Sequence, residues 1–550
     1  MGVNDLNLKG TMLRKRLLPV IVKTSEKGYS KSPGEPITVA LVRGPIASTT
    51  GAINNEAVPA IGLAYLAGHL RKHGHTAIIV DAVAEGLNKL STAEGIEGLQ
   101  CQGMTIKDTV AAIPASSRVI GIAAMFSGEW PVVRYLVEKI RQRFPDAFIV
   151  VGGEHATGLS EFTLRNSSAI DACIRGEGEH PLLELVECIS RDLNWKNVNG
   201  IAYLDNEDCY QVVSNVARIV DIDEIPWPYW PEGYLEKFWA AGKSYGVQTG
   251  RDMPFMVSRG CPFQCTFCSN PQMWTTRYIL RDVEDVINEI KFYIEKYNIT
   301  AIQLYDLTAI TKKSWAMELC QRMIDEGIYL NWSLPSGTRS EALDFEMLSM
   351  LKKTGLNYLV YAPESGSPDT LKRIKKQIKL EKLTASVVEA KKAGLILRTN
   401  LIIGFPFETR RNIFETIRYG LYLAIRGVDE VAINIFSPYP GTELFDELQA
   451  EGRLILDDDY FIALTSLNSD YTKLNPLTVN KHMGPGELGF YRITFMLLNY
   501  GIGYLLYPSR IVRTLKNIFS DHHASTVFEH RLKDMYSRRK KTKLENVSDI

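Results

Sequence analysis

The sequence predicts an α/β protein with an N-terminal doubly wound (Rossmann-like) domain, a partial (β/α)6 barrel and a C-terminal, mainly helical region. Short apolar runs alternate with amphipathic helical patterns between residues 37 and 190, and the same alternation returns between 251 and 450. Continuous apolar runs are typical of parallel strands in a sheet that is covered on both faces. The chain also has 550 residues, which is too many for a single hydrophobic core.

The N-terminal domain is expected to span residues 37–190, after a polar and irregular extension over 1–36. Its strands include "ITVALVRGP", "TAIIVDAV", "RVIGIAAMF" and "AFIVVGGEH". In a doubly wound domain, ligands bind beyond the carboxyl ends of the strands, where glycine turns let the backbone come close. Residues 191–250 are rich in Trp, Tyr and Pro and are predicted to be a connector between domains.

The second β/α series spans residues 251–450 and contains six strand–helix units. Six units form an open version of the eight-fold barrel, whose active site lies at the carboxyl ends of the strands. Residues 451–550 are mainly helical and aromatic, and they contain the basic segment "RRKKTK".

Composition excludes several classes of protein. Lys and Arg together number 63, as do Asp and Glu, so the charge balance does not favour a nucleic-acid partner. The longest apolar stretch, near 494–507, is shorter than the roughly 20 residues that a membrane-spanning helix needs. No secretory signal follows the basic N-terminus, and eight cysteines are too sparse for a disulfide scaffold. We therefore expect a cytoplasmic protein with reduced thiols.

Three of the eight cysteines, Cys261, Cys265 and Cys268, lie together in "CPFQCTFC". The next cysteine is Cys320, and no histidine occurs between His180 and His482, so a closed zinc site would need ligands from elsewhere in the chain. A 4Fe–4S cluster with three thiolate ligands fits better, because one iron is left open for a substrate. A zinc site and unrelated buried cysteines are the less favoured alternatives.

The segment "CPFQCTFC" resembles the CxxxCxΦC signature of the radical S-adenosylmethionine (SAM) enzymes, with Phe267 at the aromatic position. The resemblance implies that the three cysteines hold three irons and that the fourth iron binds the amino and carboxylate groups of SAM. It also implies that one-electron reduction cleaves SAM to methionine and a 5′-deoxyadenosyl radical. Phe267 would then pack near the adenine.

Three later segments resemble strand endings of the same family that help to hold SAM. They are "YAPESG", "LRTNLIIGFPFET" and "VAINIFSPYPGTELF", and the implied SAM contacts are Glu364, Ser365, Asn400 and Ile435. Two positions depart from the family pattern: Phe407 replaces a usual glycine, and Leu307 after Asp306 replaces the second residue of a common acidic pair. Each segment alone is also compatible with ordinary turn chemistry.

The N-terminal domain resembles the cobalamin-binding domain that precedes many radical SAM enzymes, in "VPAIGLAYLAGHLRKHGHTAIIVDA", "IVVGGEHAT" and "IRGEGEHPLLEL". The segment "DAVAEG" (81–86) stands where D-x-H-x-x-G would supply a histidine to cobalt, and Val83 has no lone pair to do so. The alternatives are a nucleotide- or flavin-binding domain, against which the missing G-x-G-x-x-G counts, and an empty, degenerate domain. His155 and His180 are each equally compatible with an exposed loop and with a cofactor edge. The cofactor contacts predicted in this domain are Ser127, Gly152, Gly153, Gly176 and Glu177.

These resemblances imply a cobalamin-dependent radical SAM enzyme, similar to the class B methyltransferases and the anaerobic magnesium-protoporphyrin monomethyl ester cyclases. The leading prediction is methylation of an unactivated carbon in an unknown substrate. The alternatives are a non-methylating radical reaction, such as anaerobic oxidative cyclisation of a tetrapyrrole, and a non-catalytic carrier of cobalamin or a cluster. We assign no catalytic acid or base, because no catalytic triad or carboxylate pair is evident.

The expected partners are a small-molecule, lipid or peptide substrate and a reductant such as flavodoxin or ferredoxin. The C-terminal region is predicted to cap the barrel. The alternative is an amphipathic helix on a membrane surface, formed by its apolar residues with Arg510, Arg513 and Lys516. In that case the cytoplasmic protein would be membrane-associated.

Overall fold

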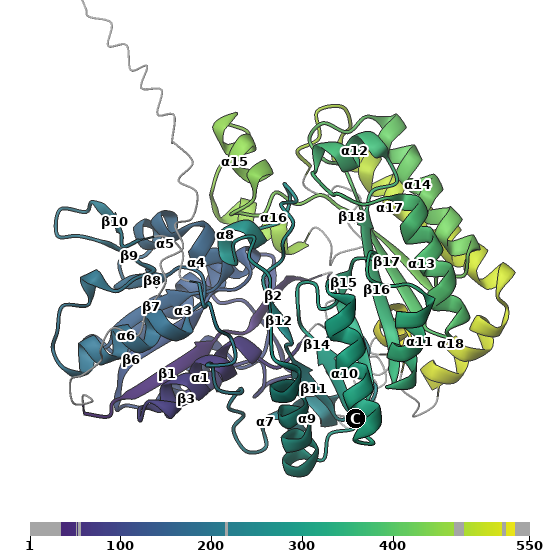
Figure 1. Cartoon of the computed structure of the whole chain (residues 1–550). Helices are drawn as coiled ribbons and strands as arrows, with labels where there is room; N and C mark the ends of the chain where they lie inside the picture. The colour runs from purple at the N-terminus through teal and green to yellow at the C-terminus, as the bar shows by residue number, and fades with distance from the viewer. Residues whose placement is uncertain are drawn as a thin grey trace, which may run out of the picture.

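The computed structural model describes residues 35–50, 52, 57–214, 218–466, 478–519 and 524–533. Two large sheets with their helices lie side by side, the N-terminal one in purple and blue and the second in teal and green (Figure 1). The predicted α/β class with a helical C-terminal region is therefore confirmed. The predicted extension over 1–36 lies outside the described residues, apart from its last two.

The N-terminal sheet has seven strands in the order β10-β9-β8-β7-β6-β1-β3. Its parallel strands are β1 (Thr38–Arg43), β3 (Thr76–Asp81), β6 (Ser117–Ala123), β7 (Phe148–Gly152) and β8 (Ala172–Ile174). The strand order reverses between β1 and β6, and ligands of open α/β sheets bind at such a switch point. The antiparallel edge is formed by β9 (Ile201–Leu204) and β10 (Tyr210–Val212). These two strands come from the predicted connector, so the sheet extends past the expected boundary at residue 190.

Helices cover both faces of this sheet, as its continuous apolar strands require. On one face, α1 (Ile61–Lys72) and α6 (Glu179–Ser190) pack in one apolar cluster. On the other face, α2 (Ile106–Ala112) and α3 (Trp130–Arg143) pack in a second cluster. The shorter elements are β2 (Ile46–Thr49), β4 (Leu90–Thr92), β5 (Leu99–Gln102), η1 (Ser127–Glu129), α4 (Glu154–Gly158), α5 (Ser160–Asn166) and η2 (Trp195–Asn197).

The second sheet consists of six parallel strands in chain order, as six β/α units predict. They are β11 (Asp252–Phe255), β14 (Ala301–Leu304), β15 (Asn331–Thr338), β16 (Leu356–Glu364), β17 (Ile396–Ile403) and β18 (Glu430–Ile435). The helices of this part are α7 (Tyr234–Ala241), α9 (Val283–Tyr297), α10 (Lys313–Asp325), α11 (Phe345–Lys353), α12 (Pro368–Arg373), α13 (Leu380–Lys392) and α14 (Arg410–Ile425). Asp282 and Asp344 begin α9 and α11 by accepting hydrogen bonds from backbone N–H groups of the first turn.

The C-terminal region divides between the two sheets. Helix α15 (Glu443–Ala450) leads to α16 (Asp458–Ser466), which packs on η1 and β2 of the N-terminal domain. Phe461 joins the apolar core around Trp130, and Arg134 binds Asp458 through two bonds of 2.8 and 3.1 Å. The chain thus returns from the barrel to hold the N-terminal domain.

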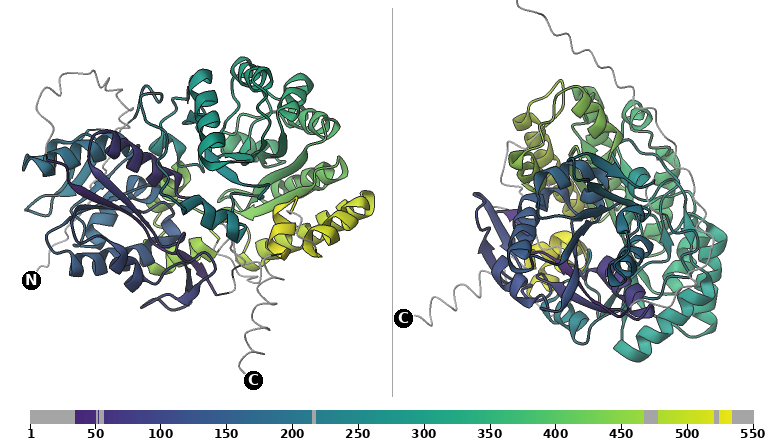
Figure 2. Two further views of the ribbon diagram at one scale, coloured as in Figure 1. Left: turned by 90° about the horizontal axis from the view of Figure 1, so that it is seen from below. Right: turned by 90° about the vertical axis from the view of Figure 1, so that its left-hand side faces the viewer.

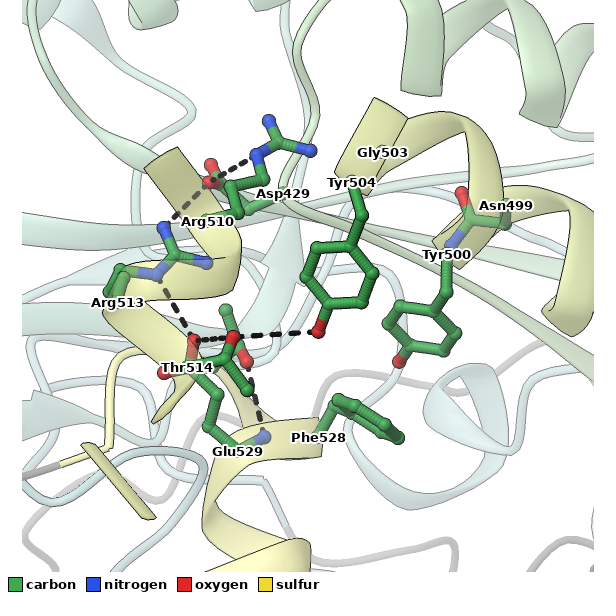
Figure 3. A pocket seen from close by; sticks show the side chains of 11 residues that line it. Asp429, Asn499, Tyr500, Gly503, Tyr504, Arg510, Arg513, Thr514, Phe528 and Glu529 are labelled. Carbon is green, nitrogen blue, oxygen red and sulfur yellow. Dashed lines mark hydrogen bonds and ion pairs between the residues drawn. The ribbon is translucent and has the colours of Figure 1, made fainter. Parts of the chain in front are cut away.

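The last two long helices pack on the barrel at its last strand, and the predicted capping role stays a prediction. No helix in the described part of the chain is long and apolar enough to cross a membrane. Helix α17 (Pro485–Leu506) packs on α14 and β18, and α18 (Ser509–Phe519) follows it. Arg510 and Arg513 both lie within 3.5 Å of Asp429, and Arg513 also binds Glu529 at 3.1 Å (Figure 3). The cavity that remains beside them measures about 10 Å³, which is room for about one water. These two arginines therefore face the protein and not a membrane.

Substitution of Gly128 by alanine is expected to loosen α16. A Cβ at Gly128 would lie 2.9 Å from the backbone N of Thr465, so α16 must shift, which costs about 1–3 kcal/mol. Amide hydrogen exchange of peptide 458–466, followed by mass spectrometry, should accelerate accordingly.

Gly62→Ala is the matched control, because a Cβ on Gly62 meets nothing within 4 Å and alanine favours the helix that contains it. Exchange of α16 should be unchanged in that variant. Unchanged exchange in Gly128→Ala as well would contradict the close contact between η1 and α16.

Candidate functional site

The cysteine loop lies between the short strand β12 (Ser258–Arg259) and helix α8 (Asn270–Met273). β12 pairs with β13 (Ile279–Leu280), and the Asn270 amide donates to the Cys261 carbonyl at 3.1 Å, which closes the loop. Asp306, at the end of β14, accepts hydrogen bonds from the backbone N–H groups of Val257 and Ser258. Burial raises the pKa of Asp306 to about 6, although these bonds act in the opposite direction. Asp306 therefore holds the start of the loop instead of facing a ligand.

All three thiols of the loop are half-buried. Burial raises the pKa of Cys265, and the nearby cations Lys376 and Arg339 counteract this. Lys376 binds Glu364 at 3.0 Å, and Arg339 lies 3.5 Å above the ring of Phe263, inside the loop. Because a thiolate is the form that binds iron, two fixed cations beside the loop favour metal binding.

The loop is compatible with a 4Fe–4S cluster. Among the described residues, no group of three or more His, Cys, Asp or Glu side chains is arranged to hold one metal ion. In a 4Fe–4S cluster each cysteine binds a different iron, so the thiols need not converge on one point. The assignment of Cys261, Cys265 and Cys268 as cluster ligands stays a prediction.

Phe267 lies in an aromatic group at the carboxyl ends of the barrel strands. Its ring centroid is 5.8 Å from that of Phe405, which in turn contacts Phe407 and Phe436. Phe407, which replaces the usual glycine, stacks on Phe405 with its centroid 5.9 Å away. The carboxylate of Glu408 shapes this turn by accepting from the N–H groups of Gly404 and Phe405.

The other predicted SAM contacts lie along the same edge of the barrel, but their side chains have different partners. Glu364 has the unusual φ of +66°. Its carboxylate binds Lys376, which lies beside the cysteine loop. The Ser365 hydroxyl is fully buried and bonds to Thr416 at 2.8 Å, so only its backbone is left for a ligand. Asn400 accepts a hydrogen bond from Arg398, and Ile435 belongs to the barrel core.

Arg259, two residues before Cys261, connects the cysteine loop to the N-terminal domain. Its guanidinium donates to Glu177 at 2.9 Å and to Glu179 at 2.6 Å, and all three side chains are buried. Burial alone would raise the pKa of Glu179, but Arg259 lowers it below its usual value. Glu177 also binds Arg218 at 2.7 Å. The carboxylate of Glu177, predicted to contact cofactor, is thus fully used between the two domains.

A second link lies at the other end of the loop. Ser269, directly after Cys268, donates to Glu154, which follows the Gly152–Gly153 turn. Burial raises the pKa of Glu154, and this hydrogen bond acts in the opposite direction. Three residues further on, the Thr157 hydroxyl lies 3.3 Å from the Met273 sulfur in α8. The cysteine loop is therefore held against the glycine turns from both ends.

The two glycine turns adopt backbone conformations that favour glycine, at Gly153 and at Gly176. Gly153 has a φ of +113°, and a Cβ there would lie 2.6 Å from the Ala124 carbonyl oxygen, so only glycine fits. Gly176, with φ +82°, donates its N–H to Thr157 at 3.0 Å. Gly152 ends β7 beside the same turn.

Ser127 and His155 form a buried pair near the strand switch point. The Ser127 hydroxyl lies 3.0 Å from His155 Nδ1, and the His155 ring stacks on Trp130. His155 is 1% exposed, so the exposed-loop interpretation is wrong for this residue, and burial lowers its pKa to about 3. His180 lies elsewhere, with its ring 5.3 Å from that of His69.

The segment "DAVAEG" forms a closed turn. Asp81 accepts from the backbone N–H of Val83 and from the Tyr234 hydroxyl, while Val83 is completely buried. Arg43 lies 3.6 Å from Asp81. Asp81 thus pairs with Tyr234 and Arg43, and the chain offers no metal ligand at position 83.

Several residues of this site were missed by sequence reasoning. They are Glu154, Arg218, Arg259, Arg339 and Lys376, together with Glu129, whose pKa burial raises to about 7 near Arg43. Glu154 follows two predicted glycines and Arg259 precedes the first cysteine by two positions, so proximity in sequence was the available signal. For the others, the sequence contains no marker.

Two family models match this chain. The model described as the radical SAM superfamily matches residues 255–420, and the model described as the B12 binding domain matches residues 55–186. The first match contains the cysteine loop, and the second contains both glycine turns.

Relatives and a solved structure agree with these matches. An uncharacterized methyltransferase of Pyrococcus horikoshii is 31% identical over 487 residues, which cover 88% of this chain and 95% of the relative. An anaerobic magnesium-protoporphyrin IX monomethyl ester cyclase of Rubrivivax gelatinosus is 28% identical over 398 residues, covering 71% and 66%. The radical S-adenosylmethionine methyltransferase TsrM of Kitasatospora setae, solved with cobalamin and a 4Fe–4S cluster, is similar in fold, with a TM-score of 0.58, 15% identity, and coverage of 76% and 78%.

The sequence signature, the paired domains and the extended similarity to a methyltransferase lead to one conclusion: this chain belongs to the cobalamin-dependent radical SAM enzymes of the methyltransferase family, which use a 4Fe–4S cluster, SAM and cobalamin.

Proposed function

We propose that this enzyme transfers a methyl group to an unactivated carbon of its substrate. The observation that carries the proposal is the double link between the cysteine loop and the N-terminal glycine turns, through Arg259 and through Ser269. A reaction that draws on two cofactors needs both of them beside one substrate. The two links support such an arrangement, because they fix the two predicted cofactor sites against each other.

The residues of this chain would bind and orient the cofactors and the substrate, and shield them from water. When bound, the cluster and SAM supply a 5′-deoxyadenosyl radical that removes a hydrogen atom from the substrate, and cobalamin supplies the methyl group. We propose that Cys261, Cys265 and Cys268 hold three irons. Lys376 and Arg339 would offset the negative charge that three thiolates bring into a half-buried loop.

The remaining contacts with SAM are proposed from the position of the residues in the barrel. Phe267, Glu364, Ser365, Asn400 and Ile435 would surround SAM at the strand ends, with Ser365 acting through its backbone because its hydroxyl is bonded to Thr416.

On the opposite side, Ser127 and the turns at Gly152–Gly153 and Gly176–Glu177 would approach cobalamin, the turns through their backbones. No protein ligand to cobalt is proposed, since Val83 occupies the expected position and is buried.

The substrate would be a small molecule, a lipid or a peptide, and a flavodoxin or ferredoxin would supply the electron. No nucleic-acid partner is proposed, because the charges of the chain balance. The reduced thiols favour the cytoplasm. We propose that the C-terminal helices contact a membrane surface on the cytoplasmic side.

A second candidate is a radical reaction that transfers no methyl group, such as oxidative cyclisation of a tetrapyrrole. The similarity to a cyclase of Rubrivivax gelatinosus favours it. Product mass separates the two, because methylation adds one CH2 for each group transferred.

Cys265→Ala should abolish the chemistry. Anaerobic incubation of reconstituted protein with SAM, cobalamin and dithionite is expected to yield 5′-deoxyadenosine and S-adenosylhomocysteine, as measured by mass spectrometry. The variant should lose bound iron and both products, because a 4Fe–4S cluster with an open iron needs all three thiolates.

Cys209→Ala is the matched control, since this exposed cysteine lies beside the edge strands β9 and β10 and should leave both products unchanged. Deoxyadenosine without S-adenosylhomocysteine would favour the second candidate. Neither product, with the cluster present, would indicate either a carrier or an enzyme that reacts only when its substrate is bound.

Ser269→Ala should weaken the coupling between the two cofactor sites and spare the cluster. Loss of the bond to Glu154 lets the loop move relative to the glycine turns, and small misplacements of reacting groups cost roughly a hundredfold in rate. We expect single-turnover formation of S-adenosylhomocysteine from cob(I)alamin to slow by about ten- to a hundredfold. Cluster absorbance should stay unchanged.

Ser160→Ala is the control for this prediction, because it removes an equivalent hydroxyl whose partner is Tyr210 in β10. Equal rates in Ser269→Ala and Ser160→Ala would show that the bond to Glu154 has no part in coupling.

A further inference from the structure

Arg218 contacts both ends of the cysteine loop. The loop leaves β12 at Arg259 and returns toward β13 at Arg277, and β12 and β13 pair with each other. Arg218 Nη2 donates to the Arg259 carbonyl at 3.1 Å and to the Arg277 carbonyl at 2.8 Å. One nitrogen thus joins the two chain segments at the point where the loop begins and ends. We call this point the neck of the loop.

The neck is packed too tightly for another side chain. Gly260 has a φ of +83°, and a Cβ on it would clash with the Arg277 carbonyl oxygen and lie 2.8 Å from Arg218 Nη2. The Arg218 and Arg259 guanidinium groups lie 5.6 and 5.8 Å from the centre of the Trp274 ring. The Arg218 side chain is 10% exposed. Its guanidinium is therefore enclosed at the neck.

The second terminal nitrogen of the same guanidinium reaches the N-terminal domain. Arg218 Nη1 donates to Glu177 at 2.7 Å, in the glycine turn after β8. The same carboxylate accepts from Arg259 and from the backbone N–H of Ile219. Figure 2, left, shows the N-terminal domain in purple and blue beside the barrel in teal and green. Arg218, from the segment between β10 and α7, thus connects the neck with a turn of the other domain.

The middle of the loop is held by other contacts. The Thr266 N–H donates to the Ile374 carbonyl at 3.1 Å, and the Thr266 carbonyl accepts from the Leu444 N–H at 3.0 Å. A change at Arg218 therefore leaves the middle of the loop attached to the barrel. It frees the neck to move relative to the glycine turn at 176–178.

We propose that Arg218 is a positioning residue for the reaction. By bonding both carbonyls of the neck and the Glu177 carboxylate at once, it fixes the cysteine loop against the turn that is proposed to approach cobalamin. A guanidinium offers N–H groups on separate nitrogens in fixed directions, whereas a lysine ammonium offers one nitrogen. The charge of Arg218 alone is thus not sufficient. This inference rests on the proposed function, because it gives Arg218 a part in coupling the two cofactor sites.

Arg218→Lys separates the charge from the bridging bonds. It keeps a cation beside Glu177, but one ammonium cannot take the places of Nη1 and Nη2 together. In reconstituted holoenzyme, single-turnover formation of S-adenosylhomocysteine from cob(I)alamin should slow by about tenfold, because this step needs both cofactor sites in place. Bound iron and formation of 5′-deoxyadenosine should stay close to the wild-type values, because the loop keeps its contacts with the barrel. A general loss of folded protein would lower both products equally.

Arg141→Lys is the matched control. Arg141 in α3 donates to the backbone carbonyls of Pro145 and Ala147 at 2.9 and 2.7 Å. It also donates to the Asp171 carboxylate at 2.6 Å. It therefore combines carbonyl and carboxylate bonds as Arg218 does, but these partners lie within the N-terminal domain. The ratio of the two products should be unchanged in this variant.

Amide hydrogen exchange of the holoenzyme tests the same contact without the reaction. In Arg218→Lys, peptides that contain residues 176–178 and 277–280 should exchange faster than in the wild type, because the neck is less firmly held. The peptide that contains Thr266 should exchange at the wild-type rate. If the wild type forms no S-adenosylhomocysteine, the proposed function fails, and the exchange rates then decide the role of Arg218.

Three results would overturn the inference. The first is a ratio of products in Arg218→Lys equal to that of the wild type, which would show that the charge suffices. The second is an equal fall of both products, which would assign Arg218 to the stability of the fold. The third is unchanged exchange at 176–178 and 277–280.

Discussion

The buried contact of Arg259 with Glu177 and Glu179 is the interaction on which the site depends. It joins β12, which precedes the cysteine loop, to the segment that follows β8 of the N-terminal sheet. The two segments are about 80 residues apart in sequence. A buried cation with two buried carboxylates gains little net stability, but removing one partner leaves an uncompensated charge and typically costs about 3–5 kcal/mol. The contact therefore fixes the relative position of the two domains and adds little to the stability of either domain.

The C-terminal region reinforces that position from two sides. Helix α16 inserts Phe461 into the N-terminal core beside Trp130, while α17 closes the barrel against α14 and β18. Contacts at Arg259, at Ser269 and at α16 thus join the two domains. Such an arrangement suits chemistry at a domain contact, where reactive groups must be held close together and away from water.

Local patterns predicted most of the fold, and long-range contacts explain what they missed. The apolar runs predicted six barrel strands and the doubly wound sheet, because a strand that is buried on both faces contains apolar residues at successive positions. The antiparallel strands β9 and β10 were assigned to a connector, because short, half-exposed edge strands do not form a continuous apolar run. The cysteines could be identified from their spacing. The pairing of Glu177 with Arg259 could not, because nothing in a glycine turn shows that its carboxylate binds a residue 82 positions away.

Electron paramagnetic resonance of the loaded enzyme tests the central claim most directly. The protein would be reconstituted with the cluster and cobalamin, then reduced so that the cluster and cob(II)alamin each carry an unpaired electron. If the cysteine loop and the glycine turns face each other as described, the two spins should show a magnetic interaction that splits or broadens the cobalt signal. Two independent, unperturbed spectra from fully loaded protein would contradict the account.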